Sequence, residues 1–245
     1  MKNKKNIFTI ILVIVFGLVF VPRIIDRLVN NDVSRSESRS LKFDNFEKNI
    51  ESLPYLIIND ERKKVPGFKF VNQNGELISN EFYLGKVYIV EFFFTTCTTI
   101  CPIMNTNLVH IQNSFTAFPN FGIASFSINP EYDTVNILSK YAKDNGIENP
   151  NWNLMTGEAD EIYELANDGF NLYTAASSDF IDGFEHSGYF ALVDKEGYIR
   201  CRQDEFGNPK IYYKGSVNFK EKLDLNGEAE EITVLKEDLL KLLNE

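Results

Sequence analysis

Phe94-Thr95-Thr96-Cys97-Thr98-Thr99-Ile100-Cys101-Pro102 is the stretch of this chain that decides its fold. It continues from residues 87–94, a largely apolar run that predicts a buried strand. Proline suits the first turn of a helix, where its missing N–H is not needed, so a helix is predicted to begin at this point. We therefore expect a strand that leads into a helix, with two cysteines at the junction.

The spacing of the two cysteines allows two kinds of chemistry. Cys97 and Cys101 are four residues apart, so their thiols would face the same way on the first turn of a helix. Their Cα atoms would then lie roughly 6 Å apart, within reach of a disulfide. The same two sulfurs could instead bind one soft metal ion. Electron exchange and metal binding both remain open from the spacing alone.

Outward from this junction, strands and helices alternate. An Asn-Gly turn predicts a hairpin between residues 68–71 and 77–78, and a second hairpin is predicted between 189–193 and 198–202. Further strands are predicted at 121–128 and 152–155. Helices are predicted at 102–118, at 133–145 with Asp133 as its N-cap, at 158–167 and at 230–244. With a redox-type cysteine pair between strand and helix, this order predicts an α/β thioredoxin-like fold with a mixed central sheet flanked by helices.

The N-terminal region is typical of a membrane-targeting segment. Lys2, Lys4 and Lys5 precede residues 7–21, which carry no charge. As a helix these residues cover about 22 Å, which suits a signal peptide or a short anchor. Because the first alanine is Ala117, an Ala-x-Ala cleavage site is absent and we expect an uncleaved signal anchor at 1–22. A polar tether at 23–52 and a folded domain at 53–245, exported to the outer side of the cell membrane, would follow.

Composition excludes several classes of function. The formal net charge of −10 disfavours binding to nucleic acid, which requires a basic surface. Three cysteines are too few for a disulfide scaffold. A functional pair with one distant thiol, Cys201, fits the count better.

The surroundings of the pair bear on its chemistry. A helix N-terminus favours thiolate over thiol, but the residues between and beside the cysteines carry no charge, so we expect weaker activation than in a strong oxidoreductase. His186 lies in a predicted loop before the strand at 189–193. Two thiolates and one imidazole would form a three-coordinate site suited to copper and compatible with zinc.

Four short motifs are spaced along the chain: Thr95-Thr96-Cys97-Thr98-Thr99-Ile100-Cys101-Pro102 with Met104, Ser127-Ile128-Asn129-Pro130 with Asp133-Thr134, Trp152-Asn153-Leu154-Met155-Thr156-Gly157, and His186-Ser187 before a strand and an Asp-x-x-Gly turn. In this order they resemble the Sco/SenC family, membrane-anchored copper chaperones of cytochrome c oxidase assembly with a thioredoxin-like domain. The resemblance runs from about residue 65 to the C-terminus. It implies that Cys97, Cys101 and His186 bind copper and that the protein delivers it to the CuA centre of an oxidase subunit.

The chain also departs from that family. Asn129 stands where the family usually has aspartate, and Val135 stands where it has proline. Residues 203–225 look longer and more polar than usual, which suggests a surface insertion. Cys201 is interpreted as a structural thiol, Met104 as a core residue and His110 as a surface histidine.

A thiol-disulfide reductase is the alternative function, because thiol exchange needs only the cysteine pair. A thioredoxin-like reductant would then be a partner. Against this reading, Trp-Cys-x-x-Cys is absent and residues 174–188 contain no proline that could face the pair. A peroxidase would need a cation beside a reactive cysteine, and the local sequence offers none. We therefore expect a metallochaperone rather than an enzyme.

Overall fold

The computed structural model describes residues 52–172, 174–176, 184–186, 188–204, 206–224 and 227–245, with only the backbone for 174–176 and 184–186. The predicted anchor at 1–22 and residues 23–51 of the predicted tether lie outside the described residues. Within those residues, no helix is both long enough and apolar enough to cross a bilayer.

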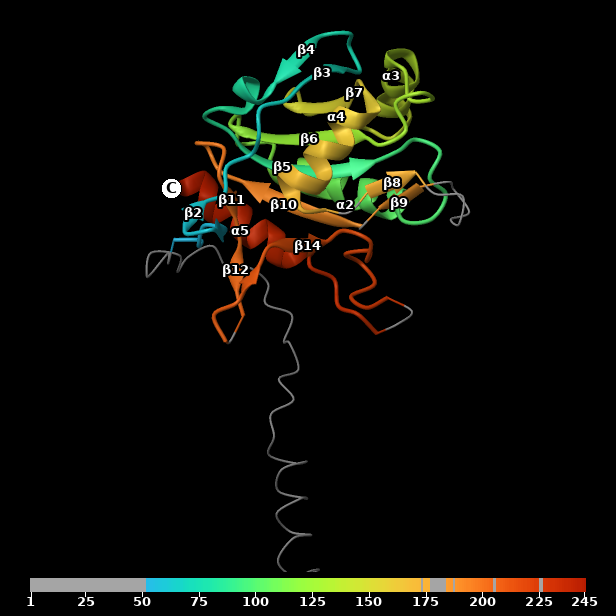
Figure 1. Cartoon of the computed structure of the whole chain (residues 1–245). Coiled ribbons are helices and arrows are strands. Elements are labelled where there is room, and N and C mark those ends of the chain that lie inside the picture. The colour runs from blue at the N-terminus through green and yellow to red at the C-terminus, as the bar shows by residue number, and fades with distance from the viewer. Residues whose placement is uncertain (1–51, 173, 177–183, 187, 205, 225–226) are drawn as a thin grey trace, which may run out of the picture. The chain divides into compact units, whose positions relative to one another are not determined.

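A mixed sheet forms the centre of the domain (Figure 1). Its strands follow the order β11-β10-β5-β6-β7-β3-β4, and β14 pairs with β10. The bounds are β3 Lys69–Asn72, β4 Leu77–Ser79, β5 Val87–Phe93, β6 Phe121–Ser127, β7 Trp152–Thr156, β10 Tyr189–Val193, β11 Ile199–Arg200 and β14 Tyr212–Lys214. β5, β6 and β7 are parallel, and β10 and β3 are antiparallel to them. The predicted mixed sheet and both predicted hairpins are confirmed.

Helices cover the two faces of this sheet. They are α2 Cys101–Ser114, α3 Val135–Asp144, α4 Ala159–Glu164 and α5 Ile232–Asn244, with a 3-10 turn η2 at Asn80–Tyr83. In Figure 1, α4 crosses the front of the sheet and α2 lies behind it. α2 packs against α5, and Gln112 of α2 donates to the carbonyl of Gly146, just beyond α3. The predicted helix at 158–167 is instead α4 followed by a π-turn, η3, at Leu165–Gly169.

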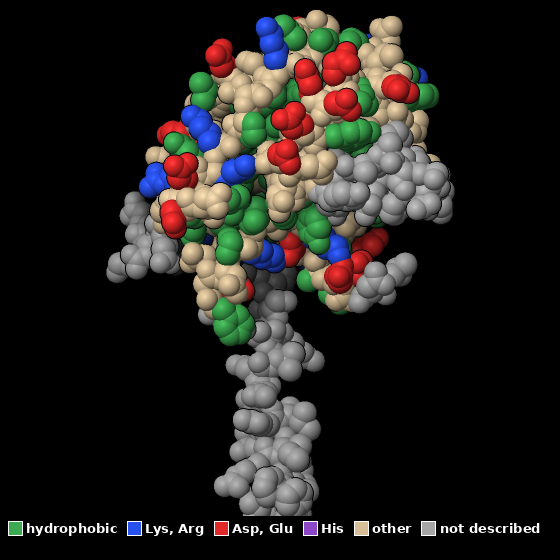
Figure 2. Space-filling model, viewed as in Figure 1, with side chains coloured by type: hydrophobic (Ala, Val, Ile, Leu, Met, Phe, Trp, Pro, Cys, Tyr) green, Lys and Arg blue, Asp and Glu red, His purple; other side chains and the backbone are tan. Residues whose placement is uncertain are grey.

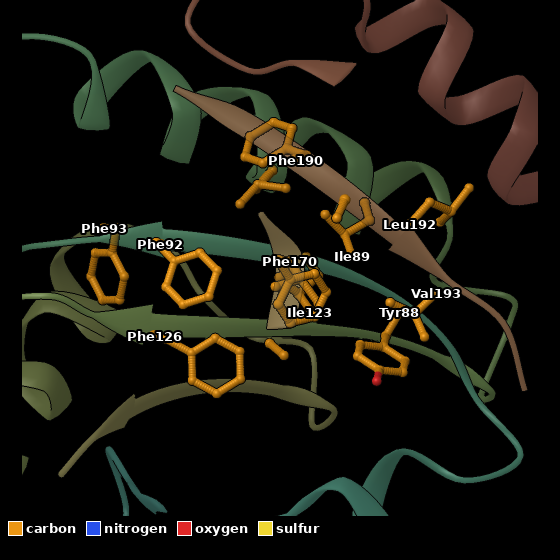
Figure 3. Close-up of a cluster of buried hydrophobic side chains, with 14 of the residues drawn as sticks. Tyr88, Ile89, Phe92, Phe93, Ile123, Phe126, Phe170, Phe190, Leu192 and Val193 are labelled. Atoms are coloured by element: carbon orange, nitrogen blue, oxygen red, sulfur yellow. The ribbon is translucent and has the colours of Figure 1, made fainter. Parts of the chain in front are cut away.

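The core explains why the sequence of β5 is almost continuously apolar. β5 lies in the middle of the sheet, between β10 and β6, and all seven of its residues are buried. Phe92 stacks on Phe126 of β6 with ring centroids 5.3 Å apart, and Phe170 meets Phe92 edge-on at 5.9 Å (Figure 3). Burial of each such side chain contributes about 1.5–3 kcal/mol. A strand in the middle of a sheet covered on both faces buries the side chains of both faces. For this reason the apolar residues of β5 follow one another almost without interruption in the sequence.

The surface reflects the acidic composition. Figure 2 shows acidic side chains gathered on the face that α4 crosses. On this side Glu161, Glu164 and Asp168 line a hollow with Lys69 and Phe70.

The part of the chain that the structure describes also contains three two-stranded sheets, separate from the central one. They are β1 Ile57–Ile58 with β2 Glu61–Arg62, β8 Thr174–Ala176 with β9 Phe184–His186, and β12 Arg202–Gln203 with β13 Pro209–Lys210. The expectation that 203–225 is a surface insertion is wrong for its middle part. β14 joins the central sheet there, and Tyr213 is buried and donates to the carboxylate of Asp238 at 2.8 Å.

Candidate metal and thiol site

The predicted junction between strand and helix is confirmed, with one correction. β5 ends at Phe93, α2 begins at Cys101, and Pro102 is in its first turn. Cys97, however, lies in the turn before the helix and not on the first helical turn. The N–H of Cys97 donates to the carbonyl of Phe94 at 3.3 Å, which bends the chain before α2 can start.

The turn nevertheless brings the two cysteines together. The backbone N–H of Cys101 donates to Sγ of Cys97 at 3.4 Å, and Oγ1 of Thr99 lies 3.5 Å from the same sulfur. Both cysteines are thiols, with exposed fractions of only 6% and 3%. The Cys97 sulfur therefore faces the N-terminus of a helix, where negative charge is favoured.

The second sulfur has a different environment. A hydrogen bond with Cys97 and burial raise the pKa of the Cys101 thiol well above its usual range. The two thiols are thus unequal, since Cys101 holds its proton while the helix N-terminus stabilises charge on Cys97. A metal ion bound to both would have to displace that proton.

Asp133 has a role that the sequence did not reveal. Predicted as an N-cap, it is followed by the actual N-cap of α3, Thr134, and is fully buried. Its carboxylate accepts the N–H of Thr95 at 3.0 Å and the hydroxyl of Ser127 at 2.5 Å, and it also accepts the hydroxyl of Thr95. Asp133 therefore ties the cysteine turn to the end of β6.

Glu91 is a second buried carboxyl group near the cysteines. It is 4% exposed and accepts the hydroxyl of Ser125 at 2.6 Å, and Ser125 in turn accepts Nε1 of Trp152 at 2.9 Å. Burial raises the pKa of Glu91 to about 7, and the Glu91 charge contributes to the raised pKa of Cys101. Glu91 is the one charged residue in 87–94. A charged residue in a buried strand is the sequence feature that could have indicated a role beyond packing.

The structure describes only the backbone of His186. This residue lies in β9, opposite Thr174 of β8, and not in the predicted loop. Two residues further, Gly188 has a φ of +68°, and a Cβ there would lie 3.0 Å from Cδ1 of Ile100. Gly188 thus packs against the residue before Cys101. Because two residues span at most about 7 Å, the backbone of His186 lies within that distance of Gly188.

The structure also places the other candidate residues. His110 is on α2, stacked on Phe219 with ring centroids 3.8 Å apart, and Cys201 is buried. Met104 is buried in the core, as predicted. Among the residues whose side chains are described, no three His, Cys, Asp or Glu side chains are grouped to hold a metal ion. That search does not reach the His186 side chain, so its predicted role stays a prediction.

The fold and the cysteine turn define a thioredoxin-like protein with a Cys-x-x-x-Cys pair. The SCO1/SenC family model matches residues 58–216, more than half of the chain, so the protein belongs to the SCO1/SenC family. The SCO1 protein homolog of Bacillus subtilis (strain 168) is 33% identical over 138 residues, which cover 56% of this chain and 71% of that protein.

Solved structures share the fold. BsSco, described as a member of the Sco family of cytochrome c oxidase assembly proteins with a disulfide switch, superposes with a TM-score of 0.58 at 28% identity over 74% of this chain and 94% of its own. ScoI of Arabidopsis thaliana, solved with copper bound, superposes with a TM-score of 0.54 at 20% identity, over 74% of this chain and 98% of its own. The second likeness shows the fold alone.

Proposed function

We propose that this protein binds one copper ion through Cys97, Cys101 and His186 and delivers it to the CuA centre of a cytochrome c oxidase subunit during assembly. One observation carries the proposal: two buried thiols meet at a helix start, and Ile100, the residue before the second thiol, lies close to Gly188, two residues after His186. Sulfur ligands select soft ions such as Cu(I), and an imidazole suits copper as well.

The relatives support the same reading. Copper is bound in the Arabidopsis protein of the same fold, and BsSco is a cytochrome c oxidase assembly protein. In this chain the copper ion is cargo that must leave again. The nearly complete burial of both cysteines limits the access of water and of competing ligands to it.

The proposed place of action follows from the N-terminal segment. Residues 1–22 combine lysines with an uncharged apolar run, as signal anchors do, so we propose that they hold an exported domain at the membrane. The acidic surface of the domain is compatible with a soluble domain that works beside the membrane and binds no nucleic acid.

Copper titration of the full chain tests the proposal. The reduced protein should bind one copper ion, and Cys97→Ser and Cys101→Ser should each lose most of the affinity. Cys201→Ser is the matched control, because Cys201 is an equally buried thiol outside the site, and this variant should bind as the wild type does. Equal binding by all four proteins would contradict the proposal.

A second candidate function is thiol-disulfide exchange on an exported protein. The disulfide switch described for BsSco, at 28% identity, favours it, since this chain also has two cysteines close enough in sequence to form a disulfide. A disulfide between Cys97 and Cys101 would have no thiolates for copper, so oxidation would switch copper binding off. Reductase activity that survives His186→Ala while copper binding is lost would assign exchange as the main activity.

A further inference from the structure

Asn107 is a buried amide two turns along the helix that begins at Cys101. Its side chain is fully buried and makes three hydrogen bonds, all to one segment. Nδ2 donates to the carbonyls of Gly215 and Val217, both at 2.8 Å, and Oδ1 accepts the N–H of Phe219 at 3.1 Å. Every hydrogen-bonding position but one on this amide is therefore used to fix residues 215–219 on α2.

The fixed segment in turn holds the residue that follows the His186 region. The N–H of Gly215 donates to the carbonyl of Gly188 at 2.9 Å, and a Cβ on Gly188 would lie 3.3 Å from Cβ of Ser216. A Cβ on Gly215 would lie 2.6 Å from the ring of Phe190, so only glycine fits between that ring and its surroundings. Gly188 is thus held by a hydrogen bond from Gly215 and lies close to both Ser216 and Ile100.

These contacts join α2 to the backbone beside His186. We infer that Asn107 is a positioning residue: through Gly215 and Gly188 it sets where the chain leaves β9, and so where His186 stands relative to Cys97 and Cys101. The inference rests on the proposed copper site for its functional consequence, but the positioning itself does not require copper.

The geometry explains why an amide is needed at this position. Two carbonyls from one turn point at the same spot on α2, and a single NH₂ group satisfies both while the amide oxygen satisfies an N–H. An apolar residue would leave these three backbone groups buried without hydrogen-bond partners, which is unfavourable unless residues 215–219 move away from α2. We expect residues 215–219 to move away from α2 rather than leave these groups without partners. Because Gly215 is hydrogen-bonded to Gly188, Gly188 would move with them.

Gln112 provides a matched control on the same helix. It is also a buried amide with three hydrogen bonds to one segment, but it fixes the chain after α3: Nε2 donates to Gly146, and Oε1 accepts the N–H groups of Glu148 and Asn149. Asn107→Ala and Gln112→Ala therefore remove comparable interactions from one helix, and only the first faces the His186 side of the domain.

Amide hydrogen exchange of the full, reduced chain without metal tests the positioning. Asn107→Ala should speed exchange in residues 184–190 and at Gly215 by about tenfold, and Gln112→Ala should leave these amides unchanged. If Asn107→Ala does not fold, Asn107→Ser supplies the same comparison. Exchange in 184–190 that is unchanged in the Asn107 variant, or equally fast in both variants, would overturn the inference.

Copper titration gives the second readout. Asn107→Ala should weaken copper binding by about tenfold and shift the copper spectrum towards that of His186→Ala, with little change in Gln112→Ala. If the wild-type chain binds no copper, the proposed function is wrong. The amide hydrogen exchange of Asn107→Ala then still tests whether Asn107 positions the backbone beside His186. Faster exchange with copper binding equal to the wild type would overturn the inference that Asn107 sets the position of His186.

Discussion

The backbone N–H of Thr95 donates to the buried carboxylate of Asp133 at 3.0 Å, across 38 positions of sequence. This bond fixes the turn that carries Cys97 to the loop before α3, and the hydroxyl of Ser127 adds the end of β6 to the same carboxylate. The cysteine turn therefore depends on a side chain that is outside the Cys-x-x-x-Cys motif.

Asp133→Asn should destabilise the domain by about 1–3 kcal/mol, because an NH₂ group would replace one of the oxygens that accept from Thr95 and Ser127. Urea unfolding measures the change. Asp144→Asn is the control: Asp144 is exposed and pairs only with Lys140 in the described structure, so its loss should cost less than about 0.5 kcal/mol. Equal effects of the two substitutions would show that Asp133 does not hold the turn.

Gly188→Ala should weaken copper binding. Its φ of +68° strains any other residue, and the added Cβ would lie 3.0 Å from Cδ1 of Ile100. The double variant Gly188→Ala/Ile100→Ala removes the contact but keeps the strain, so it should recover part of the lost affinity. Copper titration of the wild type, the single variant and the double variant measures these affinities. If Gly188→Ala binds copper as tightly as the wild type, the close approach of Gly188 to Ile100 does not matter for the copper site.

Glu91 should make stability depend on pH. Burial raises its pKa from 4.5 to about 7 in the folded state. Below about pH 4.5 the carboxyl is protonated in both folded and unfolded chains, so it has no effect. As the pH rises to about 7 the unfolded chain loses its proton first, and the folded state is destabilised by roughly 3 kcal/mol relative to low pH.

Glu91→Gln keeps an oxygen for Ser125 and removes the ionisation. The variant should be more stable than the wild type at about pH 8, and the difference should shrink as the pH falls towards about 5. Denaturant unfolding of both proteins across this range measures it. A difference that stays constant with pH would mean that Glu91 does not titrate as described.

Copper affinity should rise with pH. The pKa of the Cys101 thiol is raised by its bond to Cys97 and by burial, so copper binding at neutral pH must release a proton from it. Each proton released raises the apparent affinity by up to about tenfold per pH unit. Titrations at about pH 6 and about pH 8, in two buffers of different ionisation heat, test both the affinity and the proton release. An affinity independent of pH would contradict this account of Cys101.

The sequence predicts the architecture well because its signals are local. The apolar run of β5, the proline at the start of α2 and the glycine turns of the two hairpins each specify their own element. Apolar runs and turn residues need no knowledge of distant neighbours, so these predictions are confirmed.

The site was less predictable because its contacts are long-range. The bond between Asp133 and Thr95 and the three bonds of Asn107 join segments 38 or more residues apart. An aspartate before a helix has the same local pattern whether it caps the helix or binds a distant turn. Tyr212 and Tyr213 favour a strand, but no local feature of residues 212–214 indicates that their partner is β10. The start of α2 and the cysteine pair were predicted from the sequence. The side chains of Asp133 and Asn107 that hold the surrounding segments in place could not be.

X-ray absorption at the copper edge tests the central claim most directly. Copper bound to the full chain should show two sulfur ligands and one imidazole, and His186→Ala should lose the imidazole and keep both sulfurs. The chain has only two histidines, so His110→Ala is the matched control and should leave the spectrum unchanged. A spectrum without sulfur, or an imidazole signal that persists in His186→Ala, would contradict the copper site of Cys97, Cys101 and His186.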